Sequence, residues 1–430
     1  MPATRQRAIA LIDGNNFYAS CEAVLEPALL GRALVVLSNN DGCIVSRSAE
    51  ARRLGIAMGQ PYFQVKRELE RLGVVVRSSN YALYADMSQR LMTILERWVE
   101  DLEIYSIDEA FGLVPRRNGA DLTAWGQQLR RAVRRELGLP VAVGLAPTKV
   151  LAKLANRLAK ADPTQGQVFD LGAVADPTPH LEQVAIEDVW GIGRRLSRWC
   201  RLRGIAHARA LRDMPSGELR QKCGVVGLRL QQELRGHSCL PLILTPPPKQ
   251  ETCVSRSFSE PVRSLAQLRE AIATYTARAA EKLRRQHQRA GALSVFVRSN
   301  PFNGTSFYSN SATVTLALPS NDTAVLLAAA LPLAERLFHP HRPLQKAGVL
   351  LQHLQGEEML QHHLLQPLPP EQQQRRAALL ATIDRLNQRY GRGTVQWAAC
   401  GLQPAWAMRR ERLSRAATTR LEAIPRVLAC

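Results

Sequence analysis

The sequence EIYSIDEAFGL, residues 103–113, places two acidic side chains next to each other inside an apolar run. The surrounding isoleucine, tyrosine and phenylalanine residues favour a half-buried β-strand. Adjacent carboxylates on such a strand repel each other and lose contact with water. We therefore expect Asp108 and Glu109 to lie in the middle of a strand and to face a positively charged partner.

A third acidic residue, Asp13, ends an earlier apolar strand, AIALID, and is followed by GNNFYASCE. Carboxylates at strand ends suit Mg²⁺, a hard ion that binds few carboxylates and shares the phosphates of a substrate. Two such ions can activate a hydroxyl group and hold a leaving pyrophosphate. The competing interpretation is a surface hairpin with exposed acids at its turn, and the pattern alone leaves both open.

The charge of the chain indicates its class of partner. The 430 residues include 57 Lys and Arg against 37 Asp and Glu, a net charge of +20. Such an excess favours nucleic acid over a membrane surface as the partner. The eight cysteines form no zinc pattern, and the longest apolar run, residues 324–334, is shorter than the ~20 residues of a membrane helix. We expect a cytoplasmic protein without a membrane partner.

Strands and helices alternate along the N-terminal part of the chain, which predicts an α+β or α/β domain. Residues 81–100 form the clearest predicted helix, with one apolar face made of Leu83, Met87, Leu91, Ile94 and Trp98. Two Pro-rich stretches, residues 244–250 and 366–374, predict breaks between domains because proline continues neither a helix nor a central strand.

The segment between these breaks predicts a βαββαβ order. The expected strands are residues 251–258, 292–298, 311–318 and 345–351, and the expected helices are residues 264–289 and 322–338. The first helix carries a second, basic stripe of Arg278, Lys282, Arg285 and Arg289. Without balancing acids, this stripe indicates either contact with phosphates or a solvated face.

Residues 194–236 contain 11 Lys and Arg against 3 Asp and Glu. This segment follows a Gly-Ile-Gly turn that predicts a helix–hairpin–helix. Free backbone N–H groups at such a turn bind phosphate without reading the base sequence. We expect Gly191, Gly193 and Arg194 to contact DNA.

Several long motifs together resemble the Y-family of translesion DNA polymerases, in the order of that family from about residue 8 to residue 355. The motifs are DGNNFYASCE, LSNNDGCIVSRSAEARRLGIAMG, SSNYALYADMS, EIYSIDEAF, GLAPTKVLAKLANRLAK and VWGIGRR, with LNQRYGRGTVQWAACGLQ and MRRERLS in the tail. The resemblance implies an α+β multidomain fold, a right-hand polymerase with a ferredoxin-like palm. Its implied parts are the palm (1–17 and 84–172), small fingers (18–83), a helical thumb with the helix–hairpin–helix (173–240), a linker and βαββαβ little finger (241–355) and a tail (356–430).

The same resemblance implies the roles of single residues. Asp13, Asp108 and Glu109 match the catalytic carboxylates that bind two Mg²⁺ ions, with the Gly14 carbonyl near the second ion. Tyr18 matches the steric gate, an aromatic ring that excludes a ribose 2′-OH from the dNTP site. The other matches are Phe17 beside the gate, Ser46, Arg52 and Lys160 at the triphosphate, and Lys149 and Lys153 at the DNA backbone.

The resemblance also implies partners. They are primer–template DNA, a UmuD′-like homodimer, a RecA filament and a sliding clamp. The clamp peptide is expected at QHHLL, with Gln361, Leu364 and Leu365 as its contacts.

The function implied is error-prone, template-directed DNA synthesis across lesions in the SOS response, without proofreading. One alternative is a non-catalytic DNA-binding relative, although such a protein is expected to lack one or more of the three carboxylates. A nucleotidyl cyclase, the other alternative, needs neither a basic hairpin segment nor a second basic domain, and this chain has both.

Overall fold

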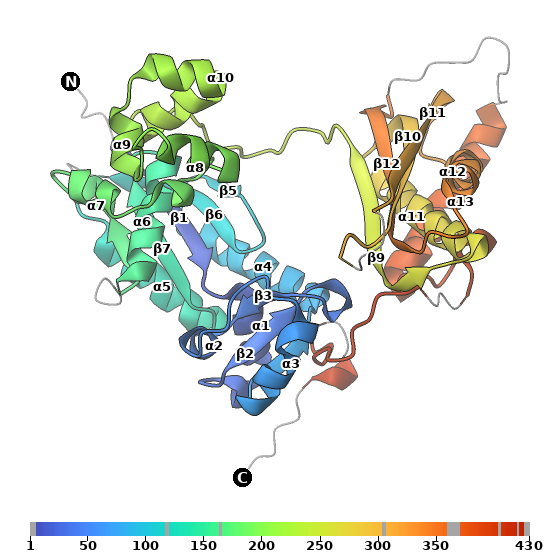
Figure 1. Cartoon of the computed structure of the whole chain (residues 1–430), viewed down its shortest axis with the longest axis horizontal. Helices are drawn as coiled ribbons and strands as arrows, with labels where there is room; N and C mark the ends of the chain where they lie inside the picture. The colour runs from blue at the N-terminus through green and yellow to red at the C-terminus, as the bar shows by residue number, and fades with distance from the viewer. Residues whose placement is uncertain are drawn as a thin grey trace. The chain divides into compact units, whose positions relative to one another are not determined.

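The computed structural model describes residues 6–116, 120–162, 166–302, 307–358, 370–402, 406–418 and 421–424. The chain divides into two compact units (Figure 1). The first contains Met1–Ser38, Gly42–Pro246 and Arg412–Cys430, and the second contains Asn39–Asp41 and Pro247–Glu411. Within the described ranges, no helix has the length and apolar character needed to span a membrane.

A five-stranded sheet with the order β5-β6-β1-β7-β8 forms the centre of the first unit. Its strands are β1 (Gln6–Gly14), β5 (Leu102–Ile104), β6 (Glu109–Arg116), β7 (Val141–Ala146) and β8 (Val168–Asp170). β1 lies in the middle and pairs antiparallel with both β6 and β7. Because it is covered on both faces, β1 is apolar and buried from Ala8 to Ile12, as is typical of a central strand.

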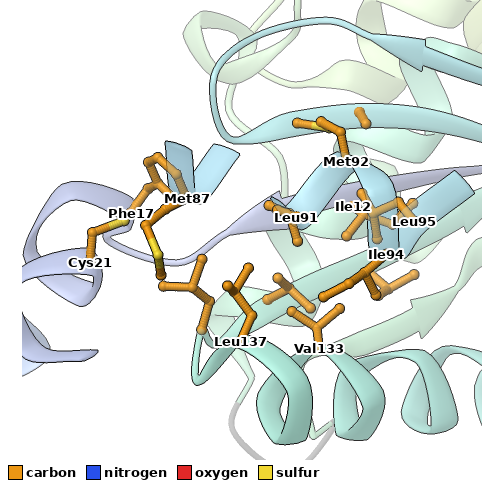
Figure 2. Close-up of a cluster of buried hydrophobic side chains, with 14 of the residues drawn as sticks. Ile12, Phe17, Cys21, Met87, Leu91, Met92, Ile94, Leu95, Val133 and Leu137 are labelled. Atoms are coloured by element: carbon orange, nitrogen blue, oxygen red, sulfur yellow. The ribbon is translucent and has the colours of Figure 1, made fainter. Parts of the chain in front are cut away.

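Helices cover both faces of this sheet. Side chains of α4 (Tyr81–Glu96) and α5 (Thr123–Leu137) pack with Ile12 on one face, as Figure 2 shows. On the other face, α6 (Lys149–Ala161) packs against Ile9 and Leu11. Alternate residues of β1 therefore enter two different cores, as the period of two of a strand requires. The expected core face of α4 is confirmed for Leu83, Met87, Leu91 and Ile94, which are buried. The helix ends at Glu96, so Trp98 lies beyond it and is half-buried.

A smaller sheet with the order β3-β2-β4 lies within the expected fingers. It consists of β2 (Leu34–Leu37), β3 (Ile44–Arg47) and β4 (Val75–Ser78), with the helices α1 (Phe17–Leu25), α2 (Ala49–Arg53) and α3 (Tyr62–Arg71). The helices that follow the central sheet are α7 (Thr178–Glu182), α8 (Arg194–Arg201), α9 (Ala208–Asp213) and α10 (Ser216–Leu234).

The second unit confirms the predicted βαββαβ order. Its elements are β9 (Thr252–Val262), α11 (Leu265–Arg285), β10 (Gln288–Arg298), β11 (Ser309–Ser320), α12 (Thr323–Leu337) and β12 (Leu344–Gly356). The sheet order is β11-β10-β12-β9, with every pair antiparallel. Each helix therefore connects two strands that are separated by a third, which makes two interlocked split βαβ units.

Part of the expected tail completes the second unit. Asp384 of α13 (Pro370–Tyr390) accepts two hydrogen bonds, of 2.7 and 2.8 Å, from Arg284 of α11. The indole of Trp406 is buried with Phe258 and Tyr275 in the core of the sheet, its ring centre 5.6 Å from that of Tyr275. Trp406 is therefore part of the hydrophobic core of the second unit.

Candidate active site

Residues 103–113 do not form one strand, and the prediction of acids in mid-strand is wrong. β5 ends at Ile104, β6 begins at Glu109, and the two strands pair as a hairpin. The backbone N–H groups of Tyr105 and Ser106 donate to the Glu109 carbonyl at 3.1 and 3.0 Å, which closes the turn. Asp108 therefore lies in the turn, where its side chain is half-buried.

The hairpin turn brings the three carboxylates to one end of the central sheet. Asp13 is the direct partner of Glu109 in the β1–β6 register. The next residue, Gly14, donates its N–H to the Asp108 carbonyl at 2.8 Å. A Cβ atom at Gly14 would lie 3.0 Å from the Phe17 ring and 3.5 Å from Asp108 Cβ, so glycine permits this close approach.

Burial changes the ionisation of two of these acids. It raises the pKa of Asp13 to about 7, with repulsion from Glu109 in the same direction and attraction by Lys160 against it. Burial likewise raises the pKa of Asp108, and a hydrogen bond from Ser106 Oγ at 2.8 Å opposes the change. Carboxylates held close together in a poorly solvated place bind a cation strongly.

Lysines of α6 supply the positive partners that the sequence led us to expect. Lys160 Nζ pairs with Asp13, and Lys153 Nζ lies 3.0 Å from Glu109 Oε2. Lys149 Nζ pairs with a third acid, Glu103 of β5. The three lysines are four and eleven residues apart, so they share one face of the helix.

The position of α6 over the sheet depends on two residues that the sequence analysis missed. Asn156 Nδ2 donates to the backbone carbonyls of Leu11 and Ala142, at 3.2 and 2.9 Å. At Gly144 of β7, an added Cβ atom would lie 2.1 Å from the backbone nitrogen of Asn156. Because only glycine permits this approach, the glycine of VAVGLA was the signal that could have revealed it.

The oxygen atoms of Asp13, Asp108 and Glu109 suit a divalent cation, although in this structure the three side chains contact other groups of the protein. Within the described ranges, no group of three or more His, Cys, Asp or Glu side chains is arranged to hold a metal ion. Asp13 and Glu109 face lysines instead, and Asp108 accepts from Ser106. Their shared position at one sheet end and their hard oxygen atoms nevertheless fit Mg²⁺.

The expected gate residue lies beside this carboxylate cluster. Tyr18 is half-buried, and its ring stacks on that of Tyr84 with centres 4.3 Å apart and planes at 13°. Burial raises the pKa of Tyr18, and the charge of Asp108 adds to that effect. Phe17, by contrast, is only 3% exposed and belongs to the core, so its ring is not available to a nucleotide.

The two expected triphosphate contacts of the fingers differ in their environment. Arg52 is exposed on α2 and has no ion pair within the described part of the chain. Ser46 is buried, and its Oγ accepts from the Ala19 N–H at 3.2 Å and donates to the Asn16 carbonyl at 3.3 Å. The Ser46 hydroxyl thus joins β3 to α1 in this structure.

Three basic residues with expected DNA contacts are engaged within the protein, and the burial of one of them, Lys149, contradicts its expected contact. Lys149 is only 3% exposed, and its Nζ also donates to the Pro241 carbonyl at 2.7 Å, so it cannot reach a DNA backbone. Lys153 is directed at Glu109, with its Nζ 4.4 Å from the centre of the Tyr105 ring. Arg278 pairs with Glu281, a balancing acid that we had excluded.

Other expected DNA contacts remain accessible. Lys282 is half-buried, and both burial and the nearby Arg278 lower its pKa, which places it in a cationic region. Gly191, with φ of 91°, and Gly193 are exposed in the turn before α8, and Arg194 begins that helix. The expected clamp contacts Gln361, Leu364 and Leu365 lie outside the described residues.

Comparison with protein families gives three matches. Residues 12–157 match the impB/mucB/samB family, and residues 249–364 match the C-terminal domain of that family. Residues 377–427 match a domain of unknown function.

Several relatives match over nearly the whole chain. Protein UmuC of Salmonella typhimurium is 45% identical over 421 residues, which cover 97% of this chain and 99% of the relative. Protein MucB of Escherichia coli is 40% identical, covering 97% and 98%. DNA polymerase IV of Corynebacterium diphtheriae is 33% identical over 237 residues, 54% of this chain and 51% of that protein.

Among solved structures, a Y-family DNA polymerase chimera of Dbh and Dpo4 matches with a TM-score of 0.61 and 20% identity, over 81% of this chain and 99% of the chimera. This likeness confirms the predicted fold class.

Proposed function

The chain belongs to the impB/mucB/samB family, within the Y-family of translesion DNA polymerases, and we propose that Asp13, Asp108 and Glu109 carry out its DNA-templated nucleotidyl transfer. The observation that carries the proposal is the β1–β6 register, which sets Asp13 opposite Glu109 beside the turn that holds Asp108. The likeness to DNA polymerase IV supports a DNA-directed DNA polymerase.

We propose that two Mg²⁺ ions bind to Asp13, Asp108, Glu109 and the carbonyl of Gly14. Bound there, the metal ions would activate the primer hydroxyl and neutralise the charge that develops on the phosphates. The residues of the chain have their own tasks. Lys160 and Lys153 hold the carboxylates, and Lys160 is the lysine assigned to the phosphates of an incoming dNTP. Arg52 is exposed, and its planar guanidinium can bridge two phosphate oxygens.

Selection of the sugar is assigned to Tyr18. Its ring is fixed by the stack on Tyr84 and stands beside the carboxylates. A rigid ring under the sugar excludes a 2′-OH by overlap, because a close-packed site cannot yield to an additional oxygen.

The location and the partners of the reaction are proposed from the similarity to UmuC. We propose that the chain extends primer–template DNA in the cytoplasm during the SOS response, together with a UmuD′-like homodimer, a RecA filament and a sliding clamp. The support is the 45% identity to UmuC over almost the full length of both chains. The clamp contact is assigned to the peptide at residues 361–365.

A non-catalytic DNA-binding relative is the alternative. The presence of all three carboxylates argues against it, since a protein without the chemistry has no need to hold three half-buried acids together.

Primer extension tests the proposal. The purified chain is given an undamaged or an abasic template with Mg²⁺ and dNTPs, alone and then with UmuD′ and RecA. Asp108→Asn removes one charge at constant shape and is expected to abolish extension. Asp121→Asn is the matched control, because Asp121 is exposed and its oxygen, which accepts from the Thr123 N–H at 2.8 Å, is retained in asparagine.

DNA binding is measured in parallel by fluorescence anisotropy. The expected result is extension by the wild type and Asp121→Asn, none by Asp108→Asn, and equal DNA binding by all three. Turnover by Asp108→Asn would remove Asp108 from the catalytic set. Binding without extension by the wild type under every condition would favour the non-catalytic alternative.

A further inference from the structure

The last described part of the chain returns to the first unit and contacts the fingers. The Ser78 N–H donates to the Arg412 carbonyl, and the Arg412 N–H donates to Ser78 Oγ, both at 3.0 Å. Ser78 is the last residue of β4, so Arg412 lies at the end of this strand. These residues lie within the segment that matches a domain of unknown function.

Ser414 contacts two polar residues of the first unit. Asn80 Nδ2 donates to Ser414 Oγ at 3.0 Å, while Asn80 Oδ1 caps α4 by accepting from the Leu83 N–H at 3.3 Å. Because its oxygen accepts from Asn80, the hydroxyl of Ser414 is left to donate. Ser414 and Glu22 line the same pocket, and the hydroxyl, acting as a donor to the Glu22 carboxylate, lowers the pKa of that acid.

Glu22 connects this contact to the nucleotide gate. Its carboxylate is 2% exposed and accepts from the Tyr84 hydroxyl at 2.6 Å. The buried Tyr84 ring is the one on which Tyr18 stacks. A buried carboxylate needs its donors, and a hydrogen bond to a charged group is stronger than one between neutral groups. Ser414 and Tyr84 thus both act on the same acid.

We propose that Ser414 is a positioning residue for sugar selection, acting through Glu22 and Tyr84 on the orientation of the Tyr18 ring. The proposal rests on the proposed function, because it assumes that Tyr18 is the gate. Residues 412–414 would then determine how strictly the polymerase rejects ribonucleotides.

The test compares Ser414→Val with Ser414→Thr, two side chains of nearly equal shape of which only threonine keeps the hydroxyl. The measurement is kcat/KM for dATP divided by kcat/KM for ATP in single-nucleotide primer extension. We expect Ser414→Val to lower this ratio by about fivefold and Ser414→Thr to retain it, because one net hydrogen bond corresponds to about that factor. Leu413→Ala is the control, since Leu413 is the neighbouring residue and is 45% exposed.

A double-mutant cycle separates positioning from general loosening of the fold. Tyr84→Phe keeps the ring but removes its hydrogen bond to Glu22. If Ser414 acts through Glu22, the effects of Ser414→Val and Tyr84→Phe on the sugar ratio are not additive. Equal thermal midpoints for Ser414→Val and Ser414→Thr, with different sugar ratios, would support positioning.

The outcomes distinguish this inference from the proposed function. If Tyr18→Ala accepts ATP while Ser414→Val matches the wild type, the gate stands and the role of Ser414 is overturned. Equal losses in Ser414→Val, Ser414→Thr and Leu413→Ala would also overturn it, since the contact would then be a general one. A wild type that extends no primer would instead overturn the proposed function itself.

Discussion

The ring of Tyr18 gives the most direct test at the scale of one residue. Its position is fixed by stacking rather than by its hydroxyl, for which no hydrogen bond is found among the described residues. Tyr18→Ala should therefore lower the dATP over ATP ratio of kcat/KM by tenfold or more, a change of about 1.4 kcal/mol in discrimination. Tyr18→Phe keeps the ring and should retain the ratio. Unchanged sugar selection in Tyr18→Ala would remove this residue from the gate.

Glu22 gives a prediction about stability and pH. Burial raises its pKa in the folded chain, while Tyr84, Ser414 and Arg77 oppose the change. A raised pKa means that ionisation of Glu22 lowers the stability of the folded chain. This loss grows as the pH rises from the pKa of the unfolded chain to the pKa of the folded chain, and it is constant above that pH. Glu22→Gln keeps an acceptor for Tyr84 without the charge. We expect its thermal midpoint to exceed that of the wild type at pH 7.5, and the difference to shrink towards pH 4. A difference independent of pH would contradict this account.

At the scale of elements, α6 shows what the sequence could and could not predict. The apolar periods of the helix and of the flanking strand β7 are local properties of the chain, so these two elements are predictable from the sequence. The pairs that α6 makes join residues far apart in sequence, such as Lys160 and Asp13. No local pattern specifies such a pair, because it depends on how closely Gly144 lets the helix approach the sheet.

The β5–β6 hairpin shows a case in which the local sequence pattern predicted the wrong structure. Its apolar and aromatic residues suggested one continuous strand, yet the turn is closed by backbone hydrogen bonds to Glu109 and by the Ser106 hydroxyl, which accepts from the Glu109 N–H at 3.1 Å. Ser106 was the available signal, because serine hydroxyls often bond to backbone groups in turns. The sequence thus indicated that the acids lie close together, but not that Asp108 lies in a turn.

The pair between α6 and β5 yields a prediction about folding. Lys149 and Glu103 are both buried, and Glu103 Oε2 also accepts from the Ile243 N–H at 2.7 Å. Lys149→Met leaves the acid unpaired in a poorly solvated place, which should lower the free energy of unfolding by about 3 kcal/mol. Lys149→Met with Glu103→Gln should recover part of that loss. Urea unfolding followed by tryptophan fluorescence measures both, and a single variant as stable as the wild type would contradict the prediction.

At the scale of the whole molecule, the net charge of +20 indicated a polyanionic partner before any motif did. The structure shows that this charge is not uniformly available, because neighbouring acids engage part of it. Arg201 of α8 is paired with both oxygens of Glu187, at 2.6 and 2.7 Å. Arg194, at the start of the same helix, is exposed and has no ion pair within the described ranges. Composition predicts the class of partner, and only the fold shows which cations are free for it.

The difference between the exposed Arg194 and the paired Arg201 gives a prediction about DNA binding. The affinity for duplex DNA should fall steeply with salt, since each phosphate that the chain neutralises releases counterions and contributes about −0.9 to the slope of log K against log salt. Arg194→Gln should reduce the magnitude of that slope by about one contact, whereas Arg201→Gln should change it less, because Glu187 already balances that charge. The slope is measured by fluorescence anisotropy titrations between about 50 and 200 mM salt. Over this range, the loss of several phosphate contacts lowers the affinity by roughly 10³-fold or more. If the affinity of the wild type did not change with salt, the proposed role of the basic segment would be contradicted. Equal changes of slope in the two variants would show that the ion pair with Glu187 does not keep Arg201 from DNA.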